Sequence, residues 1–370
     1  MNTVVGLCKG LSELGWEIHV VTTPSRFLKG RMFDFPWAKF HLINPVGKYN
    51  SLTYVANFLI KAERAIKVLS SKHSFDLVHG HSGYFGPAII PAAVKRSVGI
   101  PAFFSLYCPA SLLPNRLPLD RFGIKAISLG LDKVIAVTAN VKRSLTRCGI
   151  NAGKIEVLHS CYDEKAYCNS AYNSSIWQEE SKEDPEAQKI LFVGNVDKTK
   201  GLDIFLAAAR LVLQANPKTN FIITLHEPDE RLQSVKVLAS CRLGASVKVL
   251  GVVSDMARLM SSVDVVVAPF RSTEGISDIP IIVLEAMALG KPVVASNLEG
   301  IKEAIQHGQN GIIVDLTSPG ELANAITSLL DNPTLSEEIS SQAILGARRF
   351  SSSEISRRLS DLYLEVLEAA

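Results

Sequence analysis

Residues 274–303 read EGISDIPIIVLEAMALGKPVVASNLEGIKE, and this stretch decides the fold. A polar loop over residues 274–278 comes first. Pro280 then stands where a helix begins, and its missing N–H costs nothing in the first helical turn. The pattern predicts a helix over residues 281–288 that ends at Gly290, as a C-terminal cap requires. A helix that begins after such a loop presents free backbone N–H groups, which suit an anion.

Two more features follow from this predicted helix. Residues 293–295, just beyond a Lys-Pro turn, form a short apolar segment that is typical of a buried strand. Glu285 lies about one turn inside the helix start, where a carboxylate can accept hydrogen bonds from a pair of sugar hydroxyl groups. The stretch therefore indicates an α/β protein whose helix start binds an anion and whose carboxylate binds hydroxyl groups.

The composition is that of a soluble globular protein. Its 370 residues favour two domains, and 47% hydrophobic with 20% charged residues indicate a large core. No apolar run reaches the ~18 residues of a membrane-spanning helix, and the N-terminus lacks the plan of a signal peptide. The six cysteines form no Cys-x-x-Cys pair, which favours reduced thiols over disulfides or a zinc site. We therefore expect a cytoplasmic protein.

The two halves of the chain differ in charge. Residues 1–168 hold 21 Lys and Arg against 10 Asp and Glu, a net charge of +11. The remaining residues hold 18 against 26, a net charge of −8, and the two values sum to the overall +3. A basic first half indicates either an anionic partner or two domains that attract each other across a cleft.

A basic loop contributes to this excess. It can touch an anionic membrane surface, which would place the protein at the inner face of the membrane; a solvated basic loop is the alternative. Its basic residues are Arg26, Lys29, Arg31, Lys39 and Lys48.

Short apolar strands alternate with helices along the chain, which predicts parallel, doubly wound sheets. The strands expected in the first half are residues 17–22, 76–81, 102–106, 134–138 and 155–158. Those expected in the second half are residues 189–193, 220–225, 247–250, 264–268, 292–295 and 311–314. The expected helices are residues 1–14, 53–70, 86–97, 139–147, 202–215, 230–241, 254–261, 281–288, 300–306, 319–331 and the last 30 residues.

The repeated strand series predicts two Rossmann-like domains that face each other, with a ligand at the carboxyl ends of the strands. The first domain is expected over residues 1–163 and the second over residues 189–345. Residues 164–188, rich in Asn, Ser and Glu, are expected to be a linker. Residues 346–370 are expected to form a helix that packs back toward the first domain.

Four segments of the second half carry a resemblance to a known family. Together they are specific, although each alone is weak. On them the chain resembles the retaining glycosyltransferases of family 4, whose architecture of two Rossmann-like domains is called GT-B. The resemblance covers nearly the whole chain. The segments are residues 192–203 (FVGNVDKTKGLD), 263–269 (VDVVVAP), 284–294 (LEAMALGKPVV) and 299–303 (EGIKE).

The resemblance implies a nucleotide-sugar donor site in the second domain. Lys200 matches the family's diphosphate lysine; its alternative role is that of a solvated loop lysine. Glu285 matches the family's glutamate that holds the ribose hydroxyls. The loop that ends at Val253 resembles the one lining the base pocket, although this valine also suits a core. The N–H groups of Ile281 and Ile282, free at the helix start, can meet donor oxygen atoms.

The donor half also departs from the family pattern. The family's first glutamate, which contacts the transferred sugar, is replaced here by Ser277, and Asp278 stands beside it. Asp278 can take over that contact after a small shift of the loop. The family's phosphate arginine is replaced by Asn195, which can donate a hydrogen bond but carries no charge. Lys198 or Arg271 can supply the missing charge.

The first domain offers two candidate residues near the reacting centre. Tyr107 stands where the family often has a histidine; it keeps a hydroxyl but is no base near neutral pH. Its alternative role is a packed aromatic at a strand end. His81, at the end of Asp76-Leu-Val-His-Gly-His, resembles a histidine at the family's cleft, with a structural role as the alternative. His79 and His81 lack a carboxylate or cysteine at ligand spacing, so we expect no metal there.

The start of the sequence is the largest departure. The family opens with a strand and a Gly-Gly loop, whereas Met1-Asn2-Thr3 already begins inside the following helix. The first domain is therefore expected to lack its first, central strand. Such a loss leaves two neighbouring strands without ladder partners, which buried backbone tolerates poorly. We expect the natural or ancestral protein to be longer.

The leading hypothesis is a retaining glycosyltransferase that uses a nucleotide sugar as co-substrate and needs no metal or other cofactor. The first domain is expected to bind the acceptor, which is a glycan, a lipid-linked molecule or a small molecule; no nucleic-acid partner is expected. The second hypothesis is a glycosyltransferase-like partner or regulatory subunit without catalysis. Another GT-B enzyme, such as a nucleotide-sugar epimerase, is disfavoured by residues 285–292.

Overall fold

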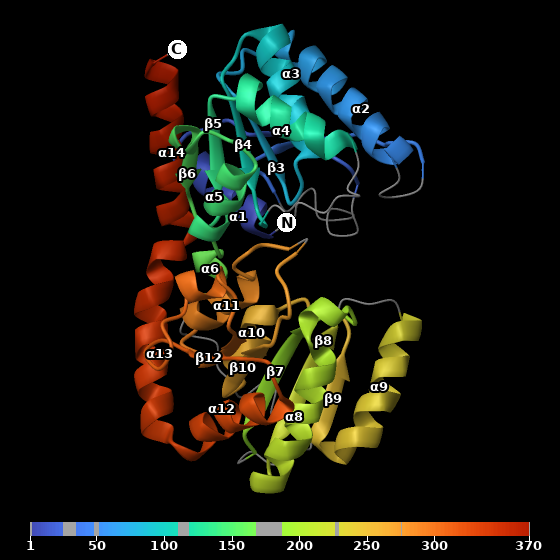
Figure 1. Cartoon of the computed structure of the whole chain (residues 1–370), viewed down its shortest axis with the longest axis vertical. Helices are drawn as coiled ribbons and strands as arrows, with labels where there is room; N and C mark the ends of the chain where they lie inside the picture. The colour runs from blue at the N-terminus through green and yellow to red at the C-terminus, as the bar shows by residue number, and fades with distance from the viewer. Residues whose placement is uncertain are drawn as a thin grey trace. The chain divides into compact units, whose positions relative to one another are not determined.

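The computed structural model describes residues 2–24, 35–47, 52–109, 118–167, 187–225, 229–274 and 276–369. The chain divides into two compact units (Figure 1). The first unit consists of residues 1–161, 274–278 and 352–370, and the second of residues 162–273 and 279–351. Most of the expected linker, residues 168–186, lies outside the described residues.

The first unit alternates helices and parallel strands. Its helices are α1 (Asn2–Glu13), α2 (Leu52–Ser70), α3 (Ile89–Val98), α4 (Pro118–Gly130), α5 (Ala139–Arg147) and α14 (Ser352–Glu368), with short 3₁₀ turns at Gly86–Ala88 and Ala152–Lys154. Its strands are β1 (His19–Thr22), β2 (Lys39–Leu42), β3 (Val78–Ser82), β4 (Ala102–Leu106), β5 (Lys133–Ala136) and β6 (Ile155–Val157).

These strands form two separate sheets instead of one. The larger sheet has the order β3-β4-β5-β6 and the smaller one consists of β1 and β2, all paired in parallel. The central strand β4 is buried along its whole length, because helices cover both faces of a parallel sheet. Among the described residues, β1 and β3 are not paired with each other.

α14 packs against α1 through small residues. Gly6 and Gly10 of α1 face Ser352 and Ser356 of α14, and a Cβ added at Gly10 would lie 2.7 Å from the Cβ of Ser356. The Ser356 hydroxyl donates to the carbonyl oxygen of Leu7 at 3.2 Å. Glycine at position 10 therefore lets the two helices approach closely, and their apolar faces share one buried cluster with β4 and β5.

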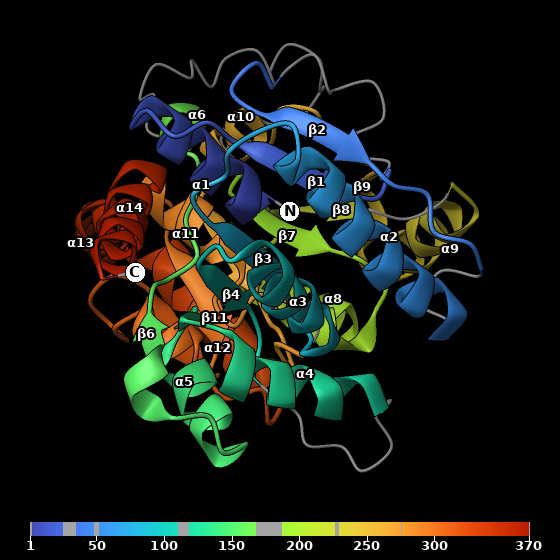
Figure 2. The same cartoon turned by 90° about the horizontal axis from the view of Figure 1, so that it is seen from above.

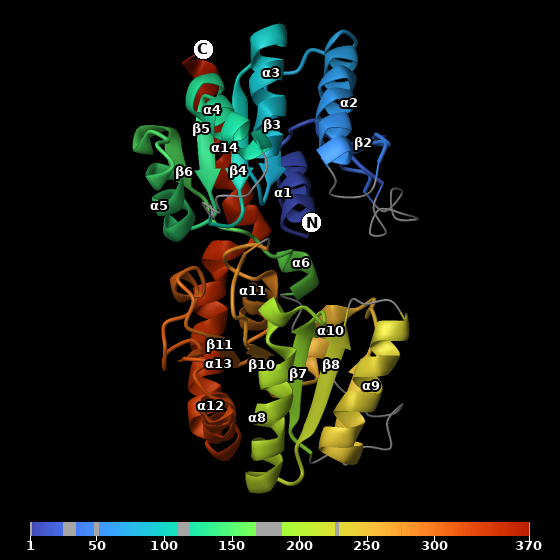
Figure 3. The same ribbon diagram turned by 45° about the vertical axis from the view of Figure 1, so that its right-hand side comes forward.

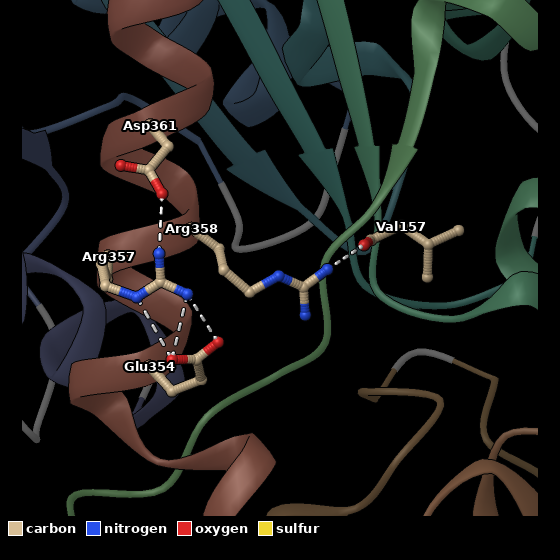
Figure 4. Close-up of polar contacts among 5 residues, drawn as sticks. All are labelled: Val157, Glu354, Arg357, Arg358 and Asp361. Carbon is tan, nitrogen blue, oxygen red and sulfur yellow. Dashed lines mark hydrogen bonds and ion pairs between the residues drawn. The ribbon is translucent and has the colours of Figure 1, made fainter.

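Polar contacts along α14 add a link to the larger sheet (Figure 4). Arg357 pairs with Glu354 and Asp361 on its own helix, whereas Arg358 donates to the carbonyl oxygen of Val157 in β6 at 3.3 Å. The Arg357 pairs are exposed and such pairs contribute little to stability. The close packing on α1 and the buried apolar cluster are therefore the main attachments of α14.

The described residues of the second unit form one sheet of six parallel strands in the order β12-β11-β10-β7-β8-β9. The strands are β7 (Lys189–Gly194), β8 (Asn220–Leu225), β9 (Val247–Leu250), β10 (Val265–Ala268), β11 (Val293–Ser296) and β12 (Ile312–Val314). The helices are α6 (Glu164–Tyr167), α8 (Leu202–Ala215), α9 (Asp229–Leu243), α10 (Met256–Ser261), α11 (Ile281–Ala288), α12 (Pro319–Asp331) and α13 (Pro333–Ala347). The 3₁₀ turns are Lys198–Lys200, Gly244–Ser246, Ile301–Glu303 and Arg348–Phe350.

Helices flank this sheet, as Figure 3 shows for α8 and α9 beside β7 and β8. α8 and α12 pack against each other, and α11 packs against α13. The main core lies between the sheet and these helices and includes Phe192, Phe205 and Phe221, which are buried almost completely. The order of the strands is that of a doubly wound nucleotide-binding fold.

The structure corrects several sequence-based expectations. It adds β2 and α4, which the sequence pattern did not predict, and the helix expected over residues 300–306 is only the 3₁₀ turn Ile301–Glu303. Of the basic loop, Lys39 belongs to β2 and pairs with Glu17, while Arg26, Lys29, Arg31 and Lys48 lie outside the described residues.

Two further expectations concern cysteines and membranes. The cysteines among the described residues, Cys8, Cys108, Cys148, Cys161 and Cys241, are free thiols. Cys168 lies outside those residues. Within the described ranges, no helix combines the length and the apolar character needed to cross a bilayer.

The packing of α1 on α14 gives a testable prediction. Gly10→Ala forces the two helices apart and should lower the free energy of unfolding by about 1–3 kcal/mol. Gly6→Ala is the matched control, because its added Cβ meets only ordinary contacts, the nearest being Cys161 Sγ at 3.4 Å. That variant should be neutral or stabilising by up to ~1 kcal/mol, since alanine favours helix. Thermal unfolding measures both, and equal effects of the two substitutions would contradict the packing argument.

Candidate active site

In the first unit, polar side chains gather where the strands of the larger sheet end. His81 lies near the end of β3 and Tyr107 follows β4, and the His81 Nδ1 and the Tyr107 hydroxyl are hydrogen-bonded at 3.1 Å. Burial lowers the pKa of His81 to about 4 and raises the pKa of Tyr107 above its ordinary value. Both side chains are therefore neutral near pH 7. The sequence indicated both residues as candidates, and the structure brings them into contact.

His79 has a different environment from His81. Its ring nitrogens are hydrogen-bonded to the hydroxyl of Ser105 at 2.8 Å and to the hydroxyl of Tyr363 in α14. Burial lowers the pKa of His79 well below its ordinary value. With both nitrogens engaged by protein hydroxyl groups, His79 ties β3 to β4 and α14.

Asp278 belongs to the first unit and is almost completely buried, with 1% of its surface exposed. Its Oδ2 accepts hydrogen bonds from the hydroxyl of Thr138 at 2.6 Å and from the side-chain amide of Asn140 at 3.1 Å. Its backbone N–H donates to the carbonyl oxygen of Tyr107 at 2.8 Å. The carboxylate proposed to contact the transferred sugar thus already binds two side chains that follow β5.

Ser277 is also engaged within the first unit. Its hydroxyl is hydrogen-bonded at 2.7 Å to the hydroxyl of Ser160, which follows β6. The segment 274–278 therefore contacts residues that follow β4, β5 and β6. Ser277 and Asp278 are therefore held at this sheet end by hydrogen bonds within the protein.

In the second unit, the direction of strand addition reverses between β7 and β10. Strands β8 and β9 are added on one side, and β11 and β12 on the other. In doubly wound sheets this switch point is where ligands bind, outside the carboxyl ends of the strands. The loops after β7 and β10 meet here, and the N–H of Arg271 donates to the carbonyl oxygen of Thr199 at 2.8 Å.

Lys200 is fixed at this switch point. Its Nζ lies over the ring of Phe270, 4.5 Å from the ring centroid, which attracts a cation. Burial lowers the pKa of Lys200 below its ordinary value, and Asp197 partly opposes this shift. Lys200 is therefore a partly desolvated ammonium group, and the alternative of a solvated loop lysine does not describe it.

Gly201 makes this arrangement possible. Its φ of 73° lies in the left-handed region, and an added Cβ would stand 2.0 Å from the carbonyl oxygen of Pro269. Only glycine allows the loop after β7 to pass so close to the loop after β10.

The polar groups around Lys200 differ in whether they already have hydrogen-bond partners. The Asn195 side-chain oxygen is buried and has no hydrogen-bond partner among the described residues. Arg271, in contrast, forms two hydrogen bonds with Asp203, at 2.6 and 2.7 Å, and a third with the carbonyl oxygen of Lys198. Arg271 can supply charge to a ligand only by leaving Asp203, and the unpaired atom of Asn195 is a hydrogen-bond acceptor.

Helix α11 begins at Ile281, after Pro280 in an extended conformation with no side-chain cap. The N–H of Val283 donates back to the carbonyl oxygen of Pro280. No such partner is found within the described part of the chain for the N–H groups of Ile281 and Ile282. The predicted bounds of this helix, residues 281–288, agree with those observed.

The end of α11 follows from Gly290, whose φ is 65°. The N–H groups of Gly290 and Lys291 donate to the carbonyl oxygens of Met287 and Ala286. This is the Schellman arrangement that glycine favours.

Glu285 is buried in α11, with 5% of its surface exposed. Tyr167 of α6 donates a hydrogen bond to its carboxylate. Burial and then the charge of Glu285 raise the pKa of Tyr167, so its hydroxyl stays protonated and remains a donor. Glu285 is thus a fixed acceptor, which suits the binding of hydroxyl groups.

Val253 lies beyond β9 and is half-buried. Its neighbour Val252 is 71% exposed, so this loop presents an apolar side chain to solvent. Val252 is therefore not a core residue. An exposed valine at a strand end can contact the apolar face of a ligand.

The sequence pattern did not identify four residues of these clusters, namely Thr138, Asn140, Tyr167 and Phe270. Thr138 is the last residue of the predicted strand 134–138 and Asn140 lies just beyond it, so the rule that ligands meet strand ends could have indicated both. Tyr167 lies inside residues 164–188, which we interpreted as a linker, although residues 164–167 form α6. No local pattern pairs it with Glu285. Among the described residues there is no group of three or more His, Cys, Asp or Glu side chains that can hold a metal ion.

Comparison with known proteins supports the resemblance. Residues 2–165 match the family model Glycosyltransferase Family 4, and residues 187–332 match the family model Glycosyl transferases group 1. The D-inositol 3-phosphate glycosyltransferase of Thermobispora bispora is 25% identical over 400 residues, covering 99% of this chain and 89% of the relative.

Two solved structures illustrate the shared fold. A glycosyltransferase from Rickettsia africae has a TM-score of 0.82 at 18% identity, covering 100% of this chain and 95% of that one. Anabaena HepE in complex with UDP-glucose has a TM-score of 0.77 at 20% identity, covering 98% and 96%. The architecture is therefore that of the GT-B fold, and with family models matching both halves, the chain belongs to the family 4 type of glycosyltransferases.

Proposed function

We propose that the protein transfers a sugar from a nucleotide-sugar donor to a hydroxyl acceptor, with retention at the anomeric carbon and without a metal ion. The observation that carries the proposal is the switch point of the second unit. There, Lys200 follows β7, while the start of α11 and Glu285 follow β10. These groups suit the two polar parts of a nucleotide sugar, its diphosphate and its ribose.

The diphosphate is the leaving group and gains negative charge as the sugar departs. The Lys200 ammonium and the N–H groups of Ile281 and Ile282 are suited to stabilise that charge, because fixed donors need no reorganisation during reaction. Asn195 adds an amide that can donate a hydrogen bond. Since these groups supply positive charge themselves, we propose that no metal ion or other cofactor is required.

Glu285 is proposed to accept hydrogen bonds from the ribose hydroxyls. The hydrogen bond from Tyr167 supports this role, because it holds the carboxylate in one orientation. Val253 and its exposed neighbour Val252 are proposed to contact the base. Among nucleotides, UDP is the first to test, because Anabaena HepE was solved with UDP and UDP-glucose.

Retention requires that the acceptor oxygen approach the anomeric carbon from the side that the diphosphate leaves. The bond from that carbon to the diphosphate oxygen breaks, a bond to the acceptor oxygen forms on the same face, and the acceptor proton passes to the diphosphate. No protein carboxylate is consumed in this step, which agrees with the engagement of Asp278 by Thr138 and Asn140.

The acceptor is proposed to bind at the ends of β3 and β4 in the first unit. Neutral His81 and Tyr107 can offer hydrogen bonds there to a glycan, a lipid-linked or a small-molecule hydroxyl. The Thermobispora bispora relative is named for an inositol phosphate acceptor, and an anionic acceptor would suit the basic first half of this chain. Peripheral contact with an anionic membrane is part of the same proposal.

A second candidate function is supported by the same site. Asn195 stands in the place of a charged residue, and Ser277 and Asp278 are engaged by Ser160, Thr138 and Asn140. A protein that binds a nucleotide sugar weakly or not at all, transfers no sugar and acts as a partner or regulatory subunit would tolerate these features.

Donor hydrolysis separates the two functions. Incubation with a panel of UDP-, GDP- and ADP-sugars should release free nucleotide diphosphate from at least one donor, and the rate should be the same with an excess of chelator. Release that stops with chelator and returns with a divalent ion would refute the metal-free proposal. Silence across the panel, together with no thermal shift on adding nucleotide diphosphates, would favour the partner subunit.

Glu285→Gln should weaken binding of the donor and of its free nucleotide diphosphate. Hydrogen bonds to a charged acceptor contribute roughly 1.5–3 kcal/mol, so an increase of about 10- to 100-fold in Kd is expected. Tyr167→Phe should raise Kd by a smaller factor, about 3- to 10-fold, because it removes only the group that orients the carboxylate.

The double variant tests whether the two residues act together. Tyr167→Phe should add little once Glu285 is replaced by Gln, since its effect passes through the carboxylate. Titration calorimetry with the nucleotide diphosphate measures all four proteins. Fully additive effects would show that Tyr167 acts independently of Glu285, and an unchanged Kd for Glu285→Gln would remove the ribose assignment.

Lys200 gives a prediction on pH. Because burial lowers its pKa, Lys200 loses its charge at a pH below the ordinary value for lysine, about 10.4. The value of kcat/KM should therefore fall as the pH rises through that lowered pKa in the free enzyme. Lys200→Arg keeps the charge and should lose this alkaline decline, even if its overall rate is lower. The same alkaline decline in both proteins would assign it to another group.

A further inference from the structure

One buried side chain of α14 reaches the acceptor side of the first unit. α14 lies beside α1 (Figure 2), and Tyr363, in the second half of α14, is 4% exposed. The Tyr363 hydroxyl is hydrogen-bonded to Nδ1 of His79 in β3, which is 284 residues away in the chain. The last helix of the chain therefore supplies a polar group to a histidine that lies two residues before His81.

The ring of Tyr363 is held by aromatic neighbours. It meets the rings of Trp16 and Phe103 edge to face, with ring centroids 5.3 and 4.9 Å away. The centroid of the His79 ring is 5.7 Å away, at an angle of 86° between the two ring planes. Such contacts stabilise the packing beyond the area that they bury. The Tyr363 hydroxyl therefore has a fixed direction toward His79, and a phenylalanine would keep the same packing without the hydroxyl.

Both members of this hydrogen bond are neutral near pH 7. Burial raises the pKa of Tyr363 well above its ordinary value and lowers the pKa of His79 well below its own. Neutral His79 has one N–H group and one unprotonated ring nitrogen. Its second nitrogen, Nε2, is hydrogen-bonded to the hydroxyl of Ser105 at 2.8 Å. Since a hydroxyl can donate or accept, the two hydroxyl neighbours decide which nitrogen of His79 carries the proton.

Of these two hydroxyl groups, that of Tyr363 is the better donor. A phenol is more acidic than an aliphatic alcohol, and its oxygen lone pairs are partly delocalised into the ring, which makes it the poorer acceptor. Within the described residues, the Tyr363 hydroxyl has no hydrogen-bond partner other than His79. Tyr363 is therefore the donor to Nδ1, and the Nε2–H of His79 donates to Ser105. This chemistry assigns the Nε2–H tautomer to His79.

The rings of His79 and His81 are in direct contact. Residues two apart in a strand point to the same face, and the two ring centroids are 4.0 Å apart with planes tilted by 32°. Most aromatic pairs are farther apart, at about 4.5–7 Å, so a rotation of one ring requires a movement of the other. His81 is in turn hydrogen-bonded through Nδ1 to the hydroxyl of Tyr107 at 3.1 Å. A chain of contacts thus connects Tyr363 with the end of β4.

We propose that Tyr363 is a positioning residue for the acceptor side. Its hydroxyl selects the Nε2–H tautomer of His79 and so fixes the ring against which His81 stacks. This inference rests on the proposed function, in which His81 and Tyr107 bind the acceptor hydroxyl. It adds a residue of the last helix, acting only through other side chains, to the groups on which transfer depends.

Two alternatives assign the hydroxyl of Tyr363 no such role. In the first, Tyr363 serves only as a packed ring, so Tyr363→Phe leaves the imidazoles of both histidines unchanged. In the second, the hydroxyl of Ser105 donates to Nε2, and Ser105 selects the tautomer of His79 instead. Removing each hydroxyl separately decides among the three, because each predicts a different variant that changes His79.

The first experiment observes the imidazole nitrogens and needs no enzymatic activity. The full chain is prepared with isotope-labelled histidine, and proton–nitrogen correlation spectra identify the protonated nitrogen of each ring near pH 7. His79→Gln and His81→Gln assign the two signals among the eight histidines. We expect Nε2–H at His79. Tyr363→Phe should lower the ratio of Nε2–H to Nδ1–H by about tenfold, because one hydrogen bond is lost, and the signals of His81 should shift with it.

Ser105→Ala and Ser360→Ala are the matched controls. Ser105→Ala removes the acceptor of Nε2–H but keeps the Tyr363 donor, so the tautomer of His79 should stay the same. Ser360→Ala removes a hydrogen bond from the same helix, since Ser360 accepts from Trp16 Nε1 at 2.9 Å. It should leave both histidines unchanged.

Three spectroscopic results would overturn the proposal. The first is an unchanged tautomer of His79 in Tyr363→Phe. The second is a tautomer that changes in Ser105→Ala and not in Tyr363→Phe. The third is a His81 that keeps its signals while those of His79 change, because the two rings would then not be coupled.

The second experiment tests the role in the reaction, with water in the place of the acceptor. Hydrolysis of the donor, beginning with UDP-glucose, should slow by at least about tenfold in Tyr363→Phe, since a misplaced group near the reacting centre costs rate. The Kd of the nucleotide diphosphate should stay the same, and Ser360→Ala should keep both values. Changed imidazoles with unchanged hydrolysis would refute the positioning role and leave the transferase intact. If the unaltered protein hydrolyses no donor, the proposed function fails, and the spectra still decide whether Tyr363 sets the two histidines.

Discussion

The pairing of backbone N–H and C=O groups along parallel strands is the constraint on which both units depend. In the second unit β7 satisfies it on both sides, through β8 and β10, and six strands form one continuous sheet. In the described part of the first unit the same requirement is met within β1-β2 and within β3-β6, and these two sheets are not paired with each other. The helices α1, α2 and α3 are nevertheless held by apolar packing. α1 packs in one buried cluster with β4, β5 and α14, and α2 and α3 pack together in another.

The same ladders also position the chemistry. Parallel strands bring all their carboxyl ends to one edge, so residues far apart in the chain become neighbours there. His81 lies near the end of β3, and Tyr107, Thr138 and Ser160 follow β4, β5 and β6; Ser277 and Asp278 bind the last three. In the second unit the edge at the switch point holds Lys200. Side-chain identity at these ends, rather than the fold itself, therefore determines what each unit can bind.

Short sequence patterns predicted the helices and strands whose bounds depend on residues close together in the chain. The bounds of α11 follow from Pro280, an apolar run and Gly290, and they agree with the structure. The buried strands of the second unit were predicted because their apolar runs are short and separated by helices. β2 is a four-residue strand at the edge of a small sheet, and only its pairing with β1 distinguishes it from a loop.

The candidate site was less accessible to such reasoning, because its contacts join distant segments. The sequence around Asp278 does not indicate which residues bind its carboxylate. Thr138 and Asn140, which do so, are 140 and 138 residues away in the chain. Likewise, Tyr167 reaches Glu285 only after the fold is complete. His81 combines a local and a distant contact, since it lies in β3 opposite Ser105 of β4 and its side chain is hydrogen-bonded to Tyr107. The β3-β4 ladder fixes the backbone of His81, and the residue that follows β4 then completes its hydrogen bond.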